Sequence, residues 1–356
     1  KKVIPVGVNY TETEAKTEAE RAANRTTIQI ERLTAKVEVA IKTGGIDFSN
    51  GTGAALTDFW VLDVLNSTFY PSAVKTEIAS GHPSNGFYTK AFYTTDPNYS
   101  GNAGLKYNYL SAATMAPVVT WMSDETSDYC IENTMEAAEQ KYKNATRIVI
   151  KATYYPATVV TAKGSATGDW FKYGNREFHD FAALKTYYGE QVQAKDNYDN
   201  NLIPMDAADY AKIEKFLKAC QIFYDNVKAQ ITTIPSGATE FATLVDTDLT
   251  GVLNGGEVVK DDETCIRWYQ DGLNYYYYEI IHNNTVFEAN GFGKYGVVRN
   301  NWYSLTLNTI SGPGTPWYPN VNPDPDPSDP NYPDPKPDPE DPLNPDTPDP
   351  EEPIGQ

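Results

Sequence analysis

The chain is poor in the residues that enzymes use for acid–base, nucleophilic and metal chemistry. Its only three histidines, His82, His179 and His282, lie before a proline, in a predicted helix and at a strand end, so none has the context of a catalytic base. The sequence contains no GxSxG, HExxH, P-loop or helix-entering GxGxxG motif. Acidic pairs such as Asp261–Asp262 are interpreted as solvated surface. These absences favour a structural or binding protein over an enzyme.

Cysteine is equally scarce. Cys130, Cys220 and Cys265 lie far apart, and no CxxC or Cys/His spacing indicates a zinc site. One disulfide with a third, unpaired thiol and three buried thiols are both compatible with the sequence, because Cys220 falls on the apolar face of a predicted helix. Cysteine usage therefore does not identify the compartment in which the protein works.

Basic residues and long apolar runs are also few. The chain has 29 Lys and Arg against 48 Asp and Glu, a formal net charge of −19. Contact with nucleic acid or with anionic membranes needs a basic face, so neither is an expected partner. No apolar run approaches the ~18–20 residues that span a bilayer. The first residues, KKVIPVGVNY, lack the apolar segment of a signal peptide.

Proline and acid are abundant at the C-terminal end. Residues 321–356 hold 13 of the 24 prolines and 11 of the acidic residues, with Lys336 as their one basic residue. This composition predicts an extended polyproline II arm, roughly 100 Å long at ~3.1 Å per residue. Because it has few large apolar residues, we do not expect it to join a sheet. Two main interpretations are a flexible spacer and a semi-rigid arm that delivers a following segment to a partner. A third, a calcium loop at DPDPSDP, is disfavoured because its prolines resist the tight turn that an ion site needs.

Alternating polarity dominates the rest of the chain, which is long enough for one large domain or two moderate ones. In ERLTAKVEVAI, residues 31–41, every second residue from Leu33 onward is apolar. Residues 57–66 are predicted to form a more fully apolar strand, residues 146–155 an alternating one, and residues 274–282 and 301–310 the two closing strands. The sequence therefore predicts a mainly β fold of the β-sandwich kind.

One region departs from this pattern. From Tyr210 to Ile231 the apolar residues recur at helical spacing, with Asp206 as the predicted N-cap, so a helix is expected over residues 206–231. A shorter helix is predicted in residues 176–188. We expect both in a helical insertion, about residues 175–231, that packs on the outside of the sandwich.

An acidic loop fits the calcium-binding template D-x-[DN]-x-[DN]-G-x5-E. The loop is DTDLTGVLNGGE, residues 246–257, in which Thr250 replaces the usual third acid or amide. The expected ligands are Asp246, Asp248, the Val252 carbonyl and Glu257. The alternative is a hydrogen-bonded Asx turn without an ion. Calcium is the only cofactor that the sequence suggests.

Three stretches together are similar to a known family. They are IERLTAKVEVAI, YQDGLNYYYYEIIHNN and GKYGVVRNNWYSLTLNTISGPGTP, the last followed closely by NPDPDPSDP. In order and spacing they resemble the major fimbrial subunit (type V pilin) family of Bacteroidetes, over most of residues 26–345. The phrase GVVRNNWY, residues 296–303, is the most distinctive part.

The resemblance implies a transthyretin-like β-sandwich in a lipoprotein precursor that is exported to the outer membrane surface. A protease would remove an N-terminal strand, and the C-terminal strand of one subunit would fill the groove of the next. Subunits would then polymerise head-to-tail by donor-strand exchange into a fimbrium that supports adhesion and virulence. Host or bacterial surface receptors would be further partners, and no catalytic residue is implied.

These considerations give a predicted domain organisation. Residues 1–25 are a linker from a missing N-terminal domain, residues 26–311 the sandwich with its helical insert, and residues 312–356 the arm. The first domain and an alternating terminal strand are expected but not contained in this sequence, which we therefore interpret as a fragment.

A glycan-binding β-sandwich module of the cell surface is the alternative function. It would need exposed aromatic residues in one patch, and the candidates are Trp60, Trp170, Trp317 and Tyr318. A fimbrial subunit instead needs a groove and an arm. A secreted hydrolase on the same scaffold is a more distant alternative.

Overall fold

The computed structural model describes residues 11–21, 32–67, 75–76, 93–94, 96, 98, 107–110, 120–135, 137–231, 241–252, 265–282, 294–316 and 354–355. The chain divides into two units, Lys1–Arg32 and Leu33–Gln356. The first contains helix α1 (Glu12–Glu20) within the predicted linker. Thr11 and Glu14 form a capping box, in which each side chain accepts a hydrogen bond from the other residue's N–H at 3.3 and 2.9 Å.

The second unit contains a three-stranded sheet of order β15-β1-β9. Its central strand β1 (Thr34–Ile41) pairs in parallel with β15 (Trp302–Leu307) and antiparallel with β9 (Thr126–Ile131). Ala35, Val37 and Val39 are buried, and the residues between them are half-buried. The strand predicted from alternation in residues 31–41 is therefore confirmed.

A four-stranded antiparallel sheet has the order β14-β10-β3-β8. Its strands are β14 (Leu273–Glu279), β10 (Arg147–Pro156), β3 (Gly51–Asp63) and β8 (Met122–Ser123). The end of β3 is buried on both faces, because Val61 and Val149 pack beneath partly buried residues that include Trp121. This explains why the predicted strand in residues 57–66 is apolar almost throughout.

An ion pair lies buried in this sheet. Arg147 of β10 stands opposite Asp63 of β3, and its Nη2 lies 2.6 Å from Asp63 Oδ2. The other carboxylate oxygen of Asp63 accepts hydrogen bonds from the N–H groups of Val64 and Leu110, at 2.7 and 2.9 Å. These bonds compensate for burying the charge of Asp63.

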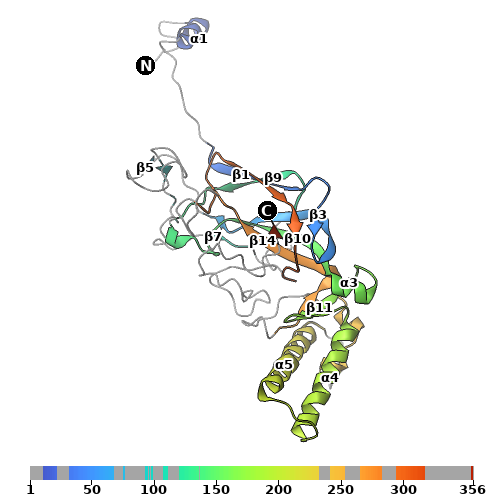
Figure 1. The fold of residues 1–356 in the computed structure, drawn as a ribbon. Coiled ribbons are helices and arrows are strands. Elements are labelled where there is room, and N and C mark those ends of the chain that lie inside the picture. The colour runs from blue at the N-terminus through green and yellow to red at the C-terminus, as the bar shows by residue number, and fades with distance from the viewer. Residues whose placement is uncertain are drawn as a thin grey trace. The chain divides into compact units, whose positions relative to one another are not determined.

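One hydrophobic core is shared by both sheets, which Figure 1 shows lying over one another. It includes Val37 of β1, Trp60 of β3, Ile150 of β10, Tyr276 of β14 and Leu307 of β15. The fold as a whole mixes helix and sheet, with several antiparallel sheets and four α-helices among the described residues. The expectation of a mainly β fold is therefore too narrow, and the transthyretin-like β-sandwich stays a prediction.

Three small sheets complete the strands of this region. The first has the order β17-β16-β2, with β17 (Ile354–Gly355), β16 (Thr309–Ile310) and β2 (Asp47–Phe48). The others pair β4 (Leu65–Asn66) with β7 (Tyr107–Asn108), and β5 (Lys75–Thr76) with β6 (Tyr93–Thr94). The expectation that residues 321–356 join no sheet is wrong at β17. Ile354 and Gly355 follow the last proline of the arm, so their N–H groups are available for a ladder.

The helices form a second region with its own core. After α3 (Ala157–Lys163), strands β11 (Trp170–Tyr173), β12 (Arg176–Phe178) and β13 (Arg267–Tyr269) form a sheet of order β12-β11-β13. Helices α4 (Phe181–Asp199) and α5 (Ala207–Gln230) pack on it through a separate, largely aromatic core. The short 3₁₀ helices of the unit are Ala137–Glu139, Phe241–Thr243, Asp246–Leu249 and Gln270–Gly272.

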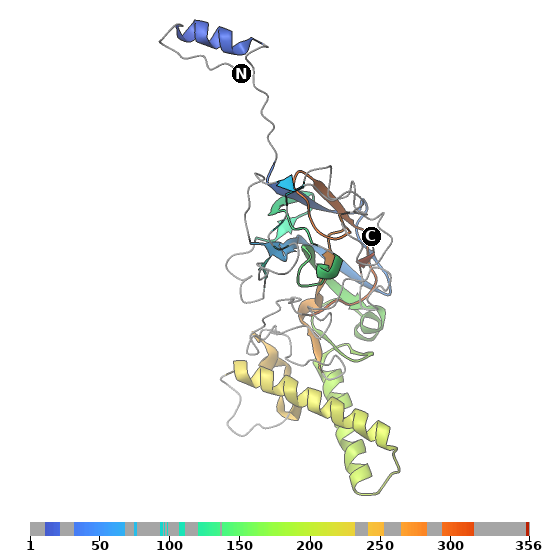
Figure 2. The same cartoon turned by 90° about the vertical axis from the view of Figure 1, so that its left-hand side faces the viewer.

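The two predicted helices meet different outcomes. The helix at residues 206–231 is confirmed as α5, and the Asp206 carboxylate accepts a hydrogen bond from the Asp209 N–H at 2.7 Å. The helix predicted from residue 176 instead begins at Phe181, because Arg176–Phe178 pair with β11 and Asp180 is the N-cap. The α4–α5 hairpin extends beyond β11 (Figures 1 and 2), rather than covering the outside of the larger sheets.

The three cysteines are all buried thiols that form no disulfide. Cys130 lies in the core between the larger sheets, whereas Cys220 belongs to the helical core. Burial raises the pKa of Cys130 to about 12, so its thiol stays protonated at neutral pH. Of the two arrangements that the sequence allowed, the structure shows three buried thiols.

Candidate functional site

Strand β15 lies at the edge of the three-stranded sheet. The carbonyls of Asn301 and Leu307 accept hydrogen bonds from N–H groups of β1 and the residue after it, at 3.0 and 3.1 Å. Because the main-chain groups of a strand alternate in direction, Trp302, Ser304 and Thr306 direct theirs to the opposite side. Among the described strands, none pairs with that side of β15. Such an edge is a template for another strand.

The same edge already carries a strand a few residues further on. β16 continues from β15 after Asn308, and β17 pairs antiparallel with it, Thr309 opposite Gly355 and Ile310 opposite Ile354. The other side of β16 pairs in parallel with β2. This edge therefore has the geometry to accept an added antiparallel strand.

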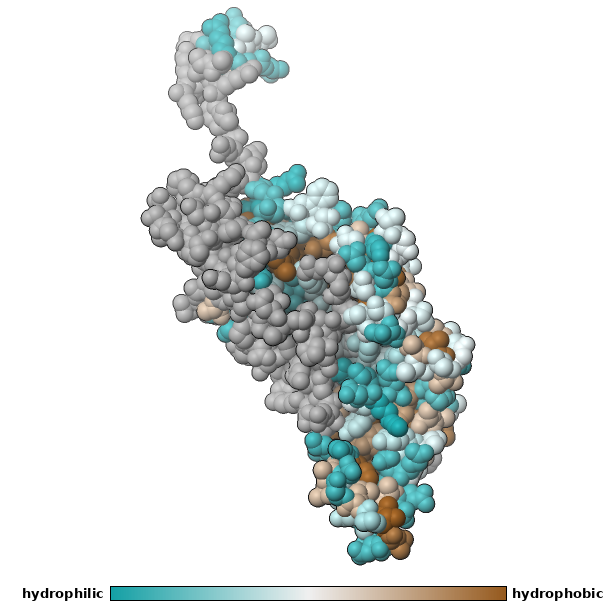
Figure 3. Space-filling view, in the orientation of Figure 1, coloured by the Kyte–Doolittle hydropathy of each residue, from teal (hydrophilic) through white to brown (hydrophobic). Residues whose placement is uncertain are grey.

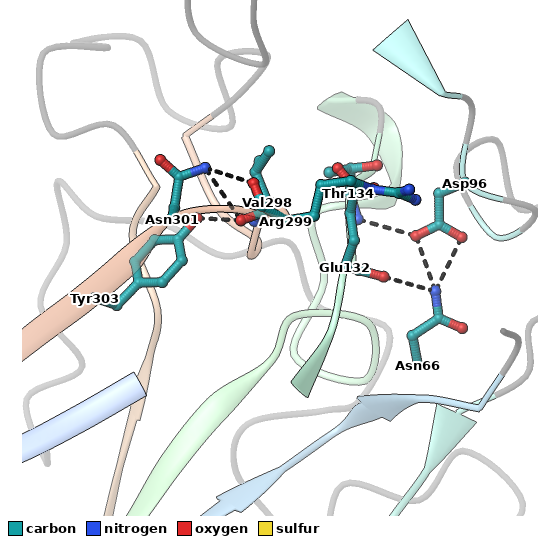
Figure 4. Close-up of polar contacts among 8 residues, drawn as sticks. All are labelled: Asn66, Asp96, Glu132, Thr134, Val298, Arg299, Asn301 and Tyr303. Atoms are coloured by element: carbon teal, nitrogen blue, oxygen red, sulfur yellow. Dashed lines mark hydrogen bonds and ion pairs between the residues drawn. The ribbon is translucent and has the colours of Figure 1, made fainter. Parts of the chain in front are cut away.

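The loop into β15 is held by side chains of the GVVRNNWY stretch. The Val298 N–H donates to the Tyr303 hydroxyl at 2.8 Å. The side-chain amide of Asn301 donates to the carbonyls of Val298 and Arg299, both at 3.1 Å (Figure 4). These bonds replace regular pairing in the loop. The distinctive motif thus fixes where the edge strand begins.

A buried ion pair joins the two outer strands of this sheet. Arg299, three residues before β15, donates from Nε to Oε2 of Glu132, which directly follows β9. Only 8% and 2% of the two side chains are exposed. Because a buried charge without its partner costs about 3–5 kcal/mol, the pair holds the ends of β9 and β15 in place.

A polar cluster continues from Glu132 to Asp96. The Asp96 carboxylate accepts hydrogen bonds from the Asn66 side chain at 3.0 Å, the Asn98 N–H at 2.9 Å and the Thr134 N–H at 3.1 Å. Asn66 also donates to the Glu132 carbonyl at 3.0 Å (Figure 4). Burial raises the pKa of Asp96 to about 6, although the hydrogen bonds favour its ionised form.

Strand β9 is the opposite edge of the sheet, and one of its outward amides is occupied. The alternation of main-chain groups directs the Tyr129 N–H away from β1. This N–H donates to Oδ1 of the neighbouring Asp128 at 2.7 Å. A side-chain acceptor on an edge amide competes with an incoming strand.

The outer face of the sheet carries a row of three side chains, Tyr129, Lys36 and Trp302, on adjacent strands. The Lys36 ammonium lies 3.8 Å from the centre of the Trp302 ring. Tyr129 and Trp302 are 56% and 62% exposed. Exposed aromatic side chains of this kind are enriched at protein interfaces.

The predicted calcium ligands are described only in part. Asp246 and Asp248 lie in the 3₁₀ helix Asp246–Leu249, where Asp248 Oδ2 accepts a hydrogen bond from the Val245 N–H at 2.9 Å. The Val252 carbonyl accepts one from the Gln270 side chain at 2.6 Å. Glu257 lies outside the described residues. Within the described part of the chain, no group of three metal-ligating side chains gathers, and calcium binding stays a prediction.

The four candidate aromatic residues do not form one platform for a glycan. Trp60 and Trp170 are completely buried, Trp60 in the core between the larger sheets and Trp170 stacked on Tyr269. They cannot contact an external sugar. Trp317 and Tyr318 lie outside the described residues.

Several parts of this site carry no signal in the sequence. Glu132 and Arg299 are 167 residues apart, and neither stands in a local pattern that predicts a partner. The role of β17 was missed because the acidic, proline-rich residues before it dominate its surroundings. The sequence GVVRNNWY is recognisable as a motif, but it does not reveal that its residues hydrogen-bond to one another.

Residues 267–347 match a family model described as major fimbrial subunit protein type IV, fimbrillin, C-terminal. The match includes the strands β13 to β16, and so the whole β15 edge. The match supports a relationship to the fimbrillin family. It also supports a structural, non-enzymatic role as a fimbrial subunit. The family suggests assembly with other fimbrial subunits in a cell-surface fimbrium.

No curated protein matches the chain. Among the described helices, none is both long and apolar enough to cross a membrane.

Proposed function

We propose that the chain is a structural subunit of a cell-surface fimbrium of the type V class of Bacteroidetes, in which subunits join head-to-tail by strand addition at the β15–β16 edge. The precursor would be a lipoprotein exported to the outer membrane, and the fimbrium would support adhesion. The single observation that carries the strand addition is β17, a short strand already added to this edge. The fimbrillin match supports the subunit role.

The register of β17 indicates how a donor strand would lie. A donor strand that continues the antiparallel pairing of β17 would run along β15 toward Trp302. Its successive residues would then lie opposite Leu307, Thr306 and the preceding residues of β15. Its main-chain groups would meet the outward groups of Trp302, Ser304 and Thr306. Main-chain hydrogen bonds then supply affinity, and alternate side chains supply specificity. A strand from a neighbouring subunit repeats this contact without closing and generates a filament.

The acidic arm fits this assembly as a tether. The composition of the arm favours an extended conformation, because proline and like charges resist compaction. A spacer of this length carries a strand away from its own subunit to the next one. The interpretation of the arm as a delivery device is therefore preferred to that of an idle spacer.

Proline substitutions on β15 test the proposal. Ser304→Pro and Thr306→Pro remove outward N–H groups that pair with no described strand, while Ser304→Ala and Thr306→Ala serve as matched controls. We expect at least a tenfold loss of fimbriae, counted by electron microscopy on cells that express the full precursor. Monomers should keep the wild-type circular dichroism spectrum. Normal fimbriae from the folded proline variants would contradict strand addition at this edge.

A further inference from the structure

A cleft of about 990 Å³ lies where the turn between β11 and β12 meets α4 and α5. Its apolar part is aromatic. The ring of Phe216 makes edge-to-face contacts with Tyr173 and Tyr187, at centroid distances of 5.0 and 4.9 Å. Phe216 is buried and belongs to the helical core, whereas the two tyrosines are half-buried. The cleft therefore has a buried aromatic floor and two half-buried tyrosines in its lining.

The charge of the cleft is opposite to that of the protein. Among the described residues, its lining includes Arg176, Lys212 and Lys215 but only one carboxylate, Asp209, in a chain of net charge −19. Lys212 pairs with Asp209 at 2.8 Å. The Arg176 guanidinium lies 4.1 Å from the centre of the Tyr187 ring, and within the described part of the chain no carboxylate comes within ion-pair distance of it.

Neutral hydrogen-bonding groups complete the lining. Asn175 lies in the β11–β12 turn and Gln191 on α4, and both contribute to the cleft. Each amide offers donors and an acceptor, which is the pattern that sugar hydroxyls require. Figure 3 shows hydrophilic and hydrophobic residues mixed over the α4–α5 hairpin, so the region as a whole does not present a purely apolar docking face.

We propose that this cleft binds the end of an acidic saccharide, a pyranose that carries a carboxylate. The apolar face of a sugar ring packs on an aromatic side chain such as Tyr173. The carboxylate is recognised by the guanidinium of Arg176, whose planar fork suits two parallel hydrogen bonds. A ligand therefore needs a sugar ring to contact the aromatic side chains and a carboxylate to pair with Arg176.

Other ligand classes fit the cleft less well. An apolar ligand would cover the Arg176 guanidinium without compensating its charge. A small inorganic anion would bind the cationic side chains but make no contact with the aromatic side chains of the lining. The cleft volume also falls at the upper end of the range for small-molecule sites, about 300–1,000 Å³.

The proposal adds a binding site to the subunit role and does not depend on strand addition. Residues 173–216 lie outside the matched family region, 267–347, and contribute nothing to the β15 edge. A protein that fails to assemble can therefore still bind the saccharide, and the reverse also holds. The two proposals fail separately.

Saturation-transfer difference NMR and calorimetry on the full chain test the site with four probes. 3′-Sialyllactose and digalacturonate carry the carboxylate on two different sugars, lactose lacks it, and sodium acetate lacks the ring. We expect at least one acidic saccharide to bind at least tenfold more tightly than lactose and acetate. The acidic saccharide with the higher affinity then identifies which sugar carries the recognised carboxylate. The proposal would be overturned if lactose or acetate bound as tightly as the acidic saccharides. It would also be overturned if none of the four probes gave a signal at millimolar concentration.

A charge-neutralising variant locates the binding. Arg176→Gln should weaken the acidic saccharide about tenfold, because a hydrogen bond to a charged group is lost. Its effect on lactose should be small. Lys218→Gln is the matched control, since Lys218 is exposed on α5 but does not line the cleft. Unchanged affinity in Arg176→Gln, or an equal loss in Lys218→Gln, would place the binding elsewhere and overturn the proposal.

Discussion

The two outer strands of the three-stranded sheet differ in what their free sides carry. β15 directs the main-chain groups of Trp302, Ser304 and Thr306 away from β1, and β17 continues the same edge as an added strand. β9 has its Tyr129 N–H bonded to the Asp128 carboxylate. One edge thus carries an added strand, whereas one outward amide of the other edge is already bonded to a side chain. A sheet with two open edges would aggregate without direction, whereas one open edge gives a polar filament.

The buried ion pair Arg299–Glu132 links the ends of the two edge strands. Breaking it should cause the largest loss of stability. Arg299→Met leaves the Glu132 carboxylate buried without its partner, and we expect the free energy of unfolding to fall by about 3–5 kcal/mol. Urea denaturation measures the change. The double variant Arg299→Met/Glu132→Met should regain most of this stability, because no buried charge is left. An equally unstable double variant would show that packing, rather than the unpaired charge, dominates the loss.

The polar cluster behind β9 should respond to pH. Because the pKa of Asp96 is raised in the folded protein to about 6, from an ordinary value of 3.8, the folded state binds the proton more tightly than the unfolded state. Its contribution to stability is then fully present below about pH 4 and is lost as the pH rises through 6. The expected size over the full pH range is about 3 kcal/mol. Denaturation at pH 5 and pH 7 should show a smaller difference in Asp96→Asn than in the wild-type protein, and equal differences would contradict the assignment.

The smallest expected effect concerns the protection of β9. Asp128→Ala removes the acceptor of the Tyr129 N–H and should change the free energy of unfolding by less than about 1 kcal/mol, because the amide then bonds to water. Hydrogen exchange of Tyr129 should become faster, and the variant should form more side-to-side aggregates in light scattering. Ser127→Ala on the same strand is the control. Unchanged aggregation would show that the carboxylate does not protect this edge.

The predictable parts of the fold are those with local periodicity. The strands β1, β10 and β15 follow from alternation, and β3 and β14 from short runs rich in apolar and aromatic residues. Helix α5 follows from helical spacing with Asp206 as its cap. The start of α4 was placed too early, because Arg176–Phe178 have partners in β11 that no local pattern reveals. The separate helical core is likewise a product of long-range contacts between residues near 170, 220 and 268.

The candidate site was less accessible to sequence reasoning. GVVRNNWY marks the loop before β15, but its meaning depends on Glu132 and on β1, which are distant in the chain. The parallel pairing of β15 with β1 has no sequence signature, and it decides which side of β15 is open. The choice of Trp60 and Trp170 as platform residues is wrong, because residue type alone does not distinguish a buried tryptophan from an exposed one.

Hydrogen–deuterium exchange, compared between the monomer and the assembled fimbrium, tests strand addition at β15 most directly. The amides of Ser304 and Thr306 pair with no described strand and should exchange rapidly in the monomer. In the fimbrium, peptides that cover β15 should gain protection of at least about a hundredfold, while peptides that cover β9 stay unchanged. Equal protection of both strands on assembly, or none in β15, would contradict the account.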